Sequence, residues 1–283
     1  MGADSSGASG AAYVFVLNGT VWTQEAKLTP SDPRGNKDFG ASVALSGSRA
    51  LIGAFNDNGG RGAAYVFTLR NTRWVQTAKL IPPADVEGGL FGVSVSLSGK
   101  RALIGADLAN NSAGSAYVFA LNSNTWTLEA ELDASDGLSG DFFGDSVSLP
   151  NDRALIGAPF DDNGAFGNGS AYVFVLAGTT WTQEAKLSAI GGANNDEFGW
   201  SVSLWGLRAV IGAPAHSRDR GTAYLFALEI TTWTQQQELT ATDIIDGDNF
   251  GFSVSLLGSR ALIGARDAYV QGIPTGASYI FGP

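Results

Sequence analysis

The sequence lacks most of the side chains that build reactive sites. Its 283 residues include no cysteine, one methionine and one histidine. The absence of cysteine excludes disulfides, zinc-thiolate sites and thiol nucleophiles. The single histidine, His216, has no second residue that pairs with it by sequence, so a Ser-His-acid triad has no local support. We therefore do not expect an enzyme.

Basic residues and long apolar runs are also scarce. The chain has 17 Lys and Arg against 27 Asp and Glu, a formal net charge of −10. Binding to phosphate backbones needs clustered cations, so we expect no nucleic-acid partner and no attraction to an anionic membrane surface. No run of 18 apolar residues occurs, which argues against membrane insertion. We expect a soluble monomer.

What the chain does contain is repetition. Glycine is abundant, at 38 residues, and aromatic residues make up 11%, a balance typical of many short strands joined by tight turns. Three marks recur at intervals of 52 to 55 residues: the Tyr of Ala-Tyr-Val-Phe and its variants at Tyr13, Tyr65, Tyr117, Tyr172, Tyr224 and Tyr279, the Phe of Phe-Gly-x-Ser-Val at Phe39, Phe91, Phe143, Phe198 and Phe250, and tryptophans at Trp22, Trp74, Trp126, Trp181 and Trp233. One supersecondary unit is therefore repeated about five times.

Each period contains four predicted strands. In the third unit they are FGDSVSL (143–149), RALIGA (153–158), SAYVFVL (170–176) and WTQEAKL (181–187), with turn residues between them. The first three are apolar at nearly every position, which predicts burial on both faces, whereas the fourth alternates and should be half exposed. This gradient predicts four-stranded blades stacked face to face, with the fourth strand outermost.

These patterns predict an all-β fold, a β-propeller of five four-stranded blades in one domain, 1–283. Four blades are complete and the fifth is a composite, at 39–80, 91–132, 143–187, 198–239, and 250–283 combined with 1–28. The chain opens with a third and a fourth strand and closes with a first, second and third, so we expect the terminal strands to pair and close the ring. Because the third strand is present at both ends, the count leaves one strand over. The extra copy could add to a blade or lie loose, or the segment could belong to a longer array of six or seven blades.

The linked motifs carry a family resemblance. Phe-Gly-x-Ser-Val, Leu-Ile-Gly-Ala-Pro (155–159) and Gly-x-Ala-Tyr-Val-Phe resemble FG-GAP repeats, the blade units of integrin α-subunit propellers and of many bacterial surface and secreted proteins. The resemblance implies a β-propeller, an extracellular or cell-surface location, and a non-catalytic binding or adhesion role with a glycan or protein as partner. Residues 1–6 lack the features of an export signal, and we expect the sequence to start inside a repeat.

One departure from the integrin pattern concerns calcium. Integrin-type repeats often carry an Asp-x-Asp-x-Asp-Gly loop between their first two strands, whereas the corresponding connections here hold too few carboxylates, at 46–48, 98–100, 150–152, 205–207 and 257–259. We therefore expect no cofactor, with calcium at other loops as the alternative. Acidic residues gather instead in loops on the opposite side, and Asp243, Asp246 and Asp248 form the best candidate metal site. The alternative is that these residues cap turns.

The residue after Phe-Gly opens the innermost strand and changes from repeat to repeat. It is Ala41, Val93, Asp145, Trp200 and Phe252. Two aromatic rings could stack on a sugar or an apolar group while a carboxylate fixes its orientation, so we predict a ligand-binding site of Asp145, Trp200 and Phe252 at the channel mouth. The alternative is that large side chains simply plug the channel.

Two further functions remain open from the sequence. A propeller glycoside hydrolase would need a second carboxylate besides Asp145, from a loop residue such as Asp196, Glu197 or Asp248. A structural segment of a larger surface protein would need no ligand at all, which fits the strong similarity among the repeats.

Overall fold

Antiparallel β-sheets make up nearly all regular structure in the computed structural model, which describes residues 9–84, 86, 88–162, 167–270 and 273–282. The chain opens with a hairpin of β1 (Ala12–Asn18) and β2 (Val21–Leu28). Four four-stranded meanders follow. They are β3 (Val43–Ser46), β4 (Arg49–Ala54), β5 (Ala63–Arg70) and β6 (Arg73–Leu80); β7 (Val95–Ser98), β8 (Arg101–Ala106), β9 (Ser115–Asn122) and β10 (Thr125–Leu132); β11 (Ser146–Ser148), β12 (Arg153–Ala158), β13 (Ser170–Ala177) and β14 (Thr180–Leu187); and β15 (Ser201–Trp205), β16 (Arg208–Ala213), β17 (Thr222–Glu229) and β18 (Thr232–Leu239).

The last blade has three strands, β19 (Phe250–Leu257), β20 (Arg260–Ala265) and β23 (Ala277–Phe281). The connection between β20 and β23 contains a small ladder of β21 (Tyr269–Val270) and β22 (Ile273–Pro274). The corresponding connections of three earlier blades contain short helical turns, α1 (Asp57–Gly60), α2 (Ala109–Ser112) and α3 (His216–Asp219). None of the helices in the described residues is long and apolar enough to span a membrane.

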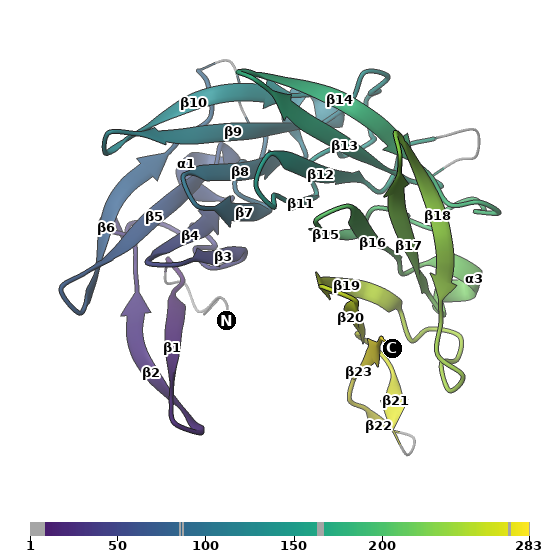
Figure 1. Ribbon diagram of the computed structural model, residues 1–283. Coiled ribbons are helices and arrows are strands. Elements are labelled where there is room, and N and C mark those ends of the chain that lie inside the picture. Colours follow the sequence, from purple (N-terminus) through teal and green to yellow (C-terminus); the bar gives the residue numbers. More distant parts are fainter. Residues whose placement is uncertain (1–8, 85, 87, 163–166, 271–272, 283) are drawn as a thin grey trace.

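The sheets follow one another along an arc, with the first strands β3, β7, β11, β15 and β19 on its inner side and the fourth strands on its outer side (Figure 1). The predicted all-β, five-bladed propeller arrangement is confirmed. In the four complete blades the second and third strands are buried along most of their length, as expected, whereas the terminal third strands β1 and β23 are mostly half-buried or exposed. The first strands are only half-buried, contrary to expectation, because one side of each faces the inside of the arc.

The terminal strands do not pair as predicted. Within the described residues, β1 pairs with β2 alone and β23 pairs with β20 alone, and no ladder joins the two ends. The physical reason is the duplicated third strand, since β1 already occupies the edge of β2 that β23 would need. Figure 1 shows the resulting opening between the β1–β2 hairpin and the last blade. The predicted closing segments, 1–28 and 250–283, also include residues 1–8, 271–272 and 283, which lie outside the described set.

The opening exposes apolar side chains of β3. Val43 and Leu45 are 46% and 62% exposed, whereas the corresponding Val95 and Leu97 of the next blade are 9% and 8% exposed. The difference arises because the blade before β3 has only the two strands of the hairpin, so part of this face lacks a partner.

An aromatic group holds each blade together. Phe143 packs edge-on against Tyr172 and Phe174 of the third strand, with ring centroids 5.4 and 6.1 Å apart. The same contacts recur at Phe39, Phe91, Phe198 and Phe250, where the Phe–Phe pairs are all edge-on and the Phe–Tyr pairs are edge-on at Phe39 and tilted at the other three. Edge-to-face pairs of buried rings stabilise beyond their buried area. The recurring Phe and Ala-Tyr-Val-Phe motifs are therefore the two halves of one core.

The serine of Phe-Gly-x-Ser-Val joins neighbouring blades. The hydroxyl of Ser146 donates to the carbonyl of Gly199, the Phe-Gly glycine of the next blade, over 2.7 Å. We call this contact the serine clasp, and it recurs from Ser42 to Gly92, Ser94 to Gly144 and Ser201 to Gly251. On the outer strands, the indoles of Trp74, Trp181 and Trp233 donate to glutamates of the preceding blade. The Phe-Gly-x-Ser-Val motif thus recurs because its Phe packs in the core of the blade and its Ser hydrogen-bonds to the next blade.

The Phe-Gly glycines leave no space for a side chain. Gly144 has φ +97°, and a Cβ atom there would lie 2.5 Å from the carbonyl oxygen of Ser115. L-residues rarely adopt this backbone conformation, and the close approach of another backbone segment excludes a methyl group. The glycine is therefore required by geometry at the point where one blade meets the next.

Candidate functional site at the inner strand starts

One recurring turn positions the three predicted ligand-binding residues. Asp145, Trp200 and Phe252 each follow Phe-Gly at or near the start of β11, β15 and β19, and each backbone N–H donates to the carbonyl of the residue before that Phe, over 3.2, 3.1 and 3.2 Å. The accepting residues, Phe142, Glu197 and Asn249, all have positive φ. Because the turn repeats, the three side chains occupy equivalent positions on three successive blades.

Trp200 and Phe252 contact each other across the blade boundary. Their ring centroids are 5.5 Å apart with an interplanar angle of 47°, and both residues are partly exposed. The guanidinium carbon of Arg266 lies 4.7 Å from the Phe252 ring centroid. The Arg266 side chain is 61% exposed, and its Nε lies 3.7 Å from Oδ1 of Asp267. These residues form a partly exposed aromatic surface with a positive charge at one edge.

Asp145 lies in an acidic environment. Its pKa is raised to about 7, first by burial and then by the negative charges of Asp107 and Glu197. Burial also raises the pKa of Asp107 to about 6, although the backbone N–H groups of Asp107 and Leu108 oppose the shift. Oδ1 of Asp107 is buried without a hydrogen-bond partner among the described residues. Near neutral pH a carboxyl group of this kind can donate as well as accept a hydrogen bond.

The segments that carry the recurring turn, aromatic core and clasp match a known repeat. The FG-GAP repeat family matches residues 22–67, 74–119, 126–174, 181–226 and 233–281. The chain belongs to this family. Each matched segment starts at a fourth-strand tryptophan and ends in the Tyr-x-Phe of the next third strand, so one FG-GAP repeat spans parts of two successive blades. None of the curated proteins compared with the chain matches it.

Sequence reasoning missed Asp107 and Arg266 as neighbours of the predicted site in this FG-GAP protein. Both follow a Gly-Ala pair at the end of a second strand, a position taken by Phe55, Pro159 and Pro214 in the other repeats. The residue after Gly-Ala lies next to the residue after Phe-Gly, and both positions change from repeat to repeat. Considering the two variable positions together would have indicated that Asp107 lies near Asp145 and Arg266 near Phe252.

The carboxylates of Asp243, Asp246 and Asp248, the predicted metal site, do not point to a common centre. Oδ2 of Asp248 accepts the backbone N–H of Ile245 over 2.8 Å, while Asp246 lies 3.6 Å from Arg218 at the surface. Asp243 instead hydrogen-bonds Tyr279, and this bond adds to burial in raising the tyrosine pKa. The described residues contain no group of three histidine or acidic side chains placed to hold a metal ion. The contacts of Asp248 match the turn-capping alternative.

His216 has a partner that the sequence did not indicate. Its Nδ1 lies 2.9 Å from Oδ2 of Asp196, which also accepts the backbone N–H of Ala193. In the repeat alignment His216 occupies the position of Asp57, and Asp196 that of Lys37, which form an ion pair in the first blade. The two contacts therefore join the same pair of positions in two repeats, although the residue types differ. Of the three loop acids considered as partners of Asp145, only Glu197 contributes to its pKa shift.

Proposed function

We propose that this FG-GAP propeller is a non-catalytic binding module, acting outside the cell or at its surface, that takes a glycan at the inner strand starts. The observation that carries the proposal is the Trp200–Phe252 pair, which is partly exposed and adjoins Arg266. A sugar ring stacks its C–H face on such aromatic surfaces while polar groups bind its hydroxyls. Asp145 supplies a carboxyl group on the neighbouring blade.

The repeats themselves support a localised site. The position after Phe-Gly holds small or medium apolar residues, Ala41 and Val93, in the first two blades and large aromatic residues in the last two. The turn is the same in both cases, since the backbone N–H groups of Ala41 and Val93 make the same hydrogen bond as those of Trp200 and Phe252. The fold therefore accepts either size, and the aromatic side chains are available for a ligand.

A glycan array followed by calorimetry tests the proposal. Trp200→Ala should reduce the affinity for the bound glycan at least about tenfold, because stacking on one ring contributes on the order of 1 kcal/mol or more. Trp205→Ala is the matched control, since Trp205 lies at the other end of the same strand and is 49% exposed. No binding to any glycan on the array, or equal affinity of the two variants, would reject this site.

A glycoside hydrolase is the second candidate, and the raised pKa of Asp145 is the observation that favours it. A general acid needs a carboxyl group that stays protonated near neutral pH, with a second carboxylate such as Glu197 opposite the substrate. Chromogenic glycosides separate the two functions. Absence of turnover, or turnover that survives Asp145→Ala, would eliminate this alternative.

A further inference from the structure

Two aspartates meet where the second and third blades adjoin. Asp107 follows the end of β8, and Asp145 follows Gly144 at the start of the third blade. The two backbones are in contact there, since a Cβ atom placed on Gly144 would lie 3.2 Å from the nitrogen of Ala106. Among the causes of the raised pKa of Asp145, burial comes first and the negative charge of Asp107 second. The two carboxyl groups therefore lie within electrostatic reach of each other.

Neither aspartate has a cation beside it in the described chain. Asp107 and Asp145 form no ion pair among the described residues, and the rest of the sequence includes no lysine, arginine or histidine. Asp107 is 8% exposed, and its Oδ1 is buried without a hydrogen-bond partner in that part of the chain. Asp145 is partly exposed. A buried acceptor thus lies next to a second carboxyl group that solvent can reach.

The fold requires neither carboxyl group. The position of Asp107 is taken by Phe55, Pro159, Pro214 and Arg266 in the other repeats, and that of Asp145 by Ala41, Val93, Trp200 and Phe252. Burial raises the pKa of both aspartates, so keeping them ionised at neutral pH costs stability. Buried carboxyl groups that destabilise a fold and are dispensable for it mark candidate functional sites.

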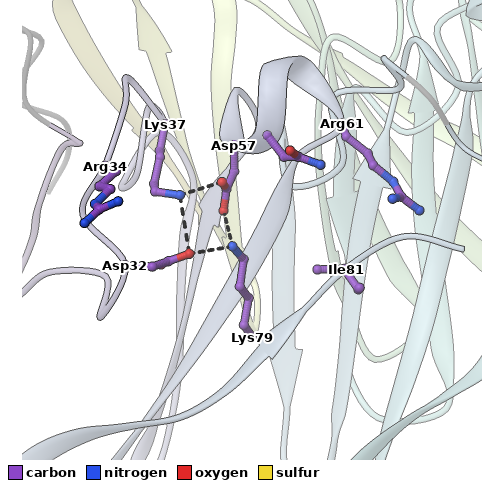
Figure 2. A pocket seen from close by; sticks show the side chains of 9 residues that line it. Asp32, Arg34, Lys37, Asp57, Arg61, Lys79 and Ile81 are labelled. Atoms are coloured by element: carbon purple, nitrogen blue, oxygen red, sulfur yellow. Dashed lines mark hydrogen bonds and ion pairs between the residues drawn. The ribbon is translucent and has the colours of Figure 1, made fainter. Parts of the chain in front are cut away.

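The same chain shows what fits between two neighbouring carboxylates. In the first blade, Nζ of Lys79 lies 2.8 Å from Asp32 and 2.6 Å from Asp57, as Figure 2 shows. Lys186 bridges two acids of the third blade in the same way, at 2.7 and 2.8 Å. An ammonium group carries three N–H donors, so one cation can satisfy two carboxylates through charge-assisted hydrogen bonds. The pair between the second and third blades is a similar arrangement with the place of the ammonium group left to a ligand.

The pair also adjoins the turn that carries Trp200. The carbonyl of Glu197 accepts the backbone N–H of Trp200 over 3.1 Å. After burial and Asp107, the negative charge of Glu197 is the third cause of the raised pKa of Asp145. Asp145 therefore lies within electrostatic reach of this turn, on the blade before the Trp200–Phe252 pair.

We propose that Asp107 and Asp145 bind the ammonium group of an amino sugar in the glycan that stacks on Trp200 and Phe252. This inference rests on the glycan function proposed above and names the class of sugar. A protonated amine donates to Oδ1 of Asp107 and to the carboxylate of Asp145, whereas the hydroxyl groups of a neutral sugar leave both negative charges without a counter-ion. An amino sugar keeps the C–H face that stacks on aromatic rings. The net charge of −10 also attracts a cationic ligand.

Calorimetry on the full chain at neutral pH tests the proposal with three trisaccharides of the same linkage. They are the glucosamine trisaccharide, its N-acetylated form and cellotriose, which carry an amine, a neutral amide and a hydroxyl at the same positions. We expect the glucosamine trisaccharide to bind at least about tenfold more tightly than the other two, and added salt to reduce the difference. Equal affinities would overturn the amino-sugar inference and leave the glycan function standing. No binding of the three sugars would also overturn it, and the glycan array then decides separately on the proposed function.

Variants locate the amine at the pair. Asp107→Asn removes one charge at nearly constant shape, and it should weaken binding of the glucosamine trisaccharide at least about tenfold without lowering the melting temperature. Asp107→Pro, which installs the residue that the third and fourth repeats carry, is the second variant. Trp200→Ala should instead weaken binding of all three sugars. Glu229→Gln, exposed at the end of β17, is the control for general attraction of a cation to an acidic protein.

Two results would reject the site. The first is an equal loss of affinity in the Asp107 and Glu229 variants, or no loss in either. The second comes from a trilysine peptide, which tests the other source of an ammonium group: its binding in place of the glucosamine trisaccharide would overturn the amino-sugar assignment.

Discussion

Asp145 provides a direct test of the electrostatics at the inner strand starts. Its pKa is about 7 in the folded protein, against a reference value of 3.8. Well below pH 3.8 the carboxyl group is neutral in both the folded and the unfolded chain, so it has no effect on stability. As the pH rises from 4 to 7, the unfolded chain loses the proton while the folded protein retains it. The free energy of unfolding therefore falls over this range, and the loss is complete above pH 7.

The magnitude follows from the size of the shift. About three pKa units at roughly 1.4 kcal/mol each give a cost of about 4 kcal/mol at pH 8, as an upper estimate. Asp145→Asn removes the charge at nearly constant shape. We expect the variant to be about 2 to 4 kcal/mol more stable than the wild type at pH 8 and within about 0.5 kcal/mol of it at pH 4.

Urea unfolding followed by tryptophan fluorescence at both pH values measures the difference. Glu229→Gln, at an exposed position at the end of β17, removes one carboxylate without disturbing the inner strands and serves as the control. A gain of the same size at pH 4 and pH 8, or no gain at pH 8, would refute the reasoning. Asp145 would then be well solvated, and the case for a protonated carboxyl group at this site would fail.

Two further predictions concern the blades. Phe119→Ala removes a residue that is 6% exposed and whose ring centroid lies 6.0 Å from that of Phe91. Urea unfolding should show a loss of about 3 to 5 kcal/mol in the free energy of unfolding. Thr127→Ala, on the exposed side of β10, should lower it by less than about 0.5 kcal/mol. Small and equal effects would contradict the packed core. Gly144→Ala should lower the melting temperature far more than Gly140→Ala, since both glycines have φ near +100° but only at Gly144 would the new methyl group meet another backbone segment. Equal effects would show that backbone conformation alone, and not the close approach, requires the glycine.

The sequence was sufficient for the architecture because each blade is a local meander. Each strand pairs with its neighbour in the sequence. Local patterns therefore predict these strands: apolar runs such as RALIGA (153–158), the turn residues after them and the period near 52 residues. The predicted arrangement of five blades followed from counting such units. The open arc did not follow, because the sequence left open where the extra third strand would lie, and in the structure β1 takes the edge of β2 that β23 would need.

The same distinction applies to the candidate sites. Asp145, Trp200 and Phe252 could be found because they occupy a variable position in a regular motif. The contact of Arg266 with Phe252 could not be read from either residue alone, since it joins the ends of two different strands. The contact between His216 and Asp196 was hidden for a related reason: the loops that carry them meet only after the fourth strand of one blade leads into the next.

The serine clasps also predict the order in which the blades unfold. In the third blade, Gly144 accepts a clasp from Ser94 while Ser146 donates one to Gly199, so this blade is held from both sides. In the described residues, Ser253 of the last blade donates no clasp and Gly40 of the first receives none. When each unit is stabilised by its neighbours, an end unit opens at a lower free energy than an interior one. Backbone amides should then exchange with solvent in a gradient, fastest in the terminal blades and slowest in the third, with the array fraying inward one repeat at a time.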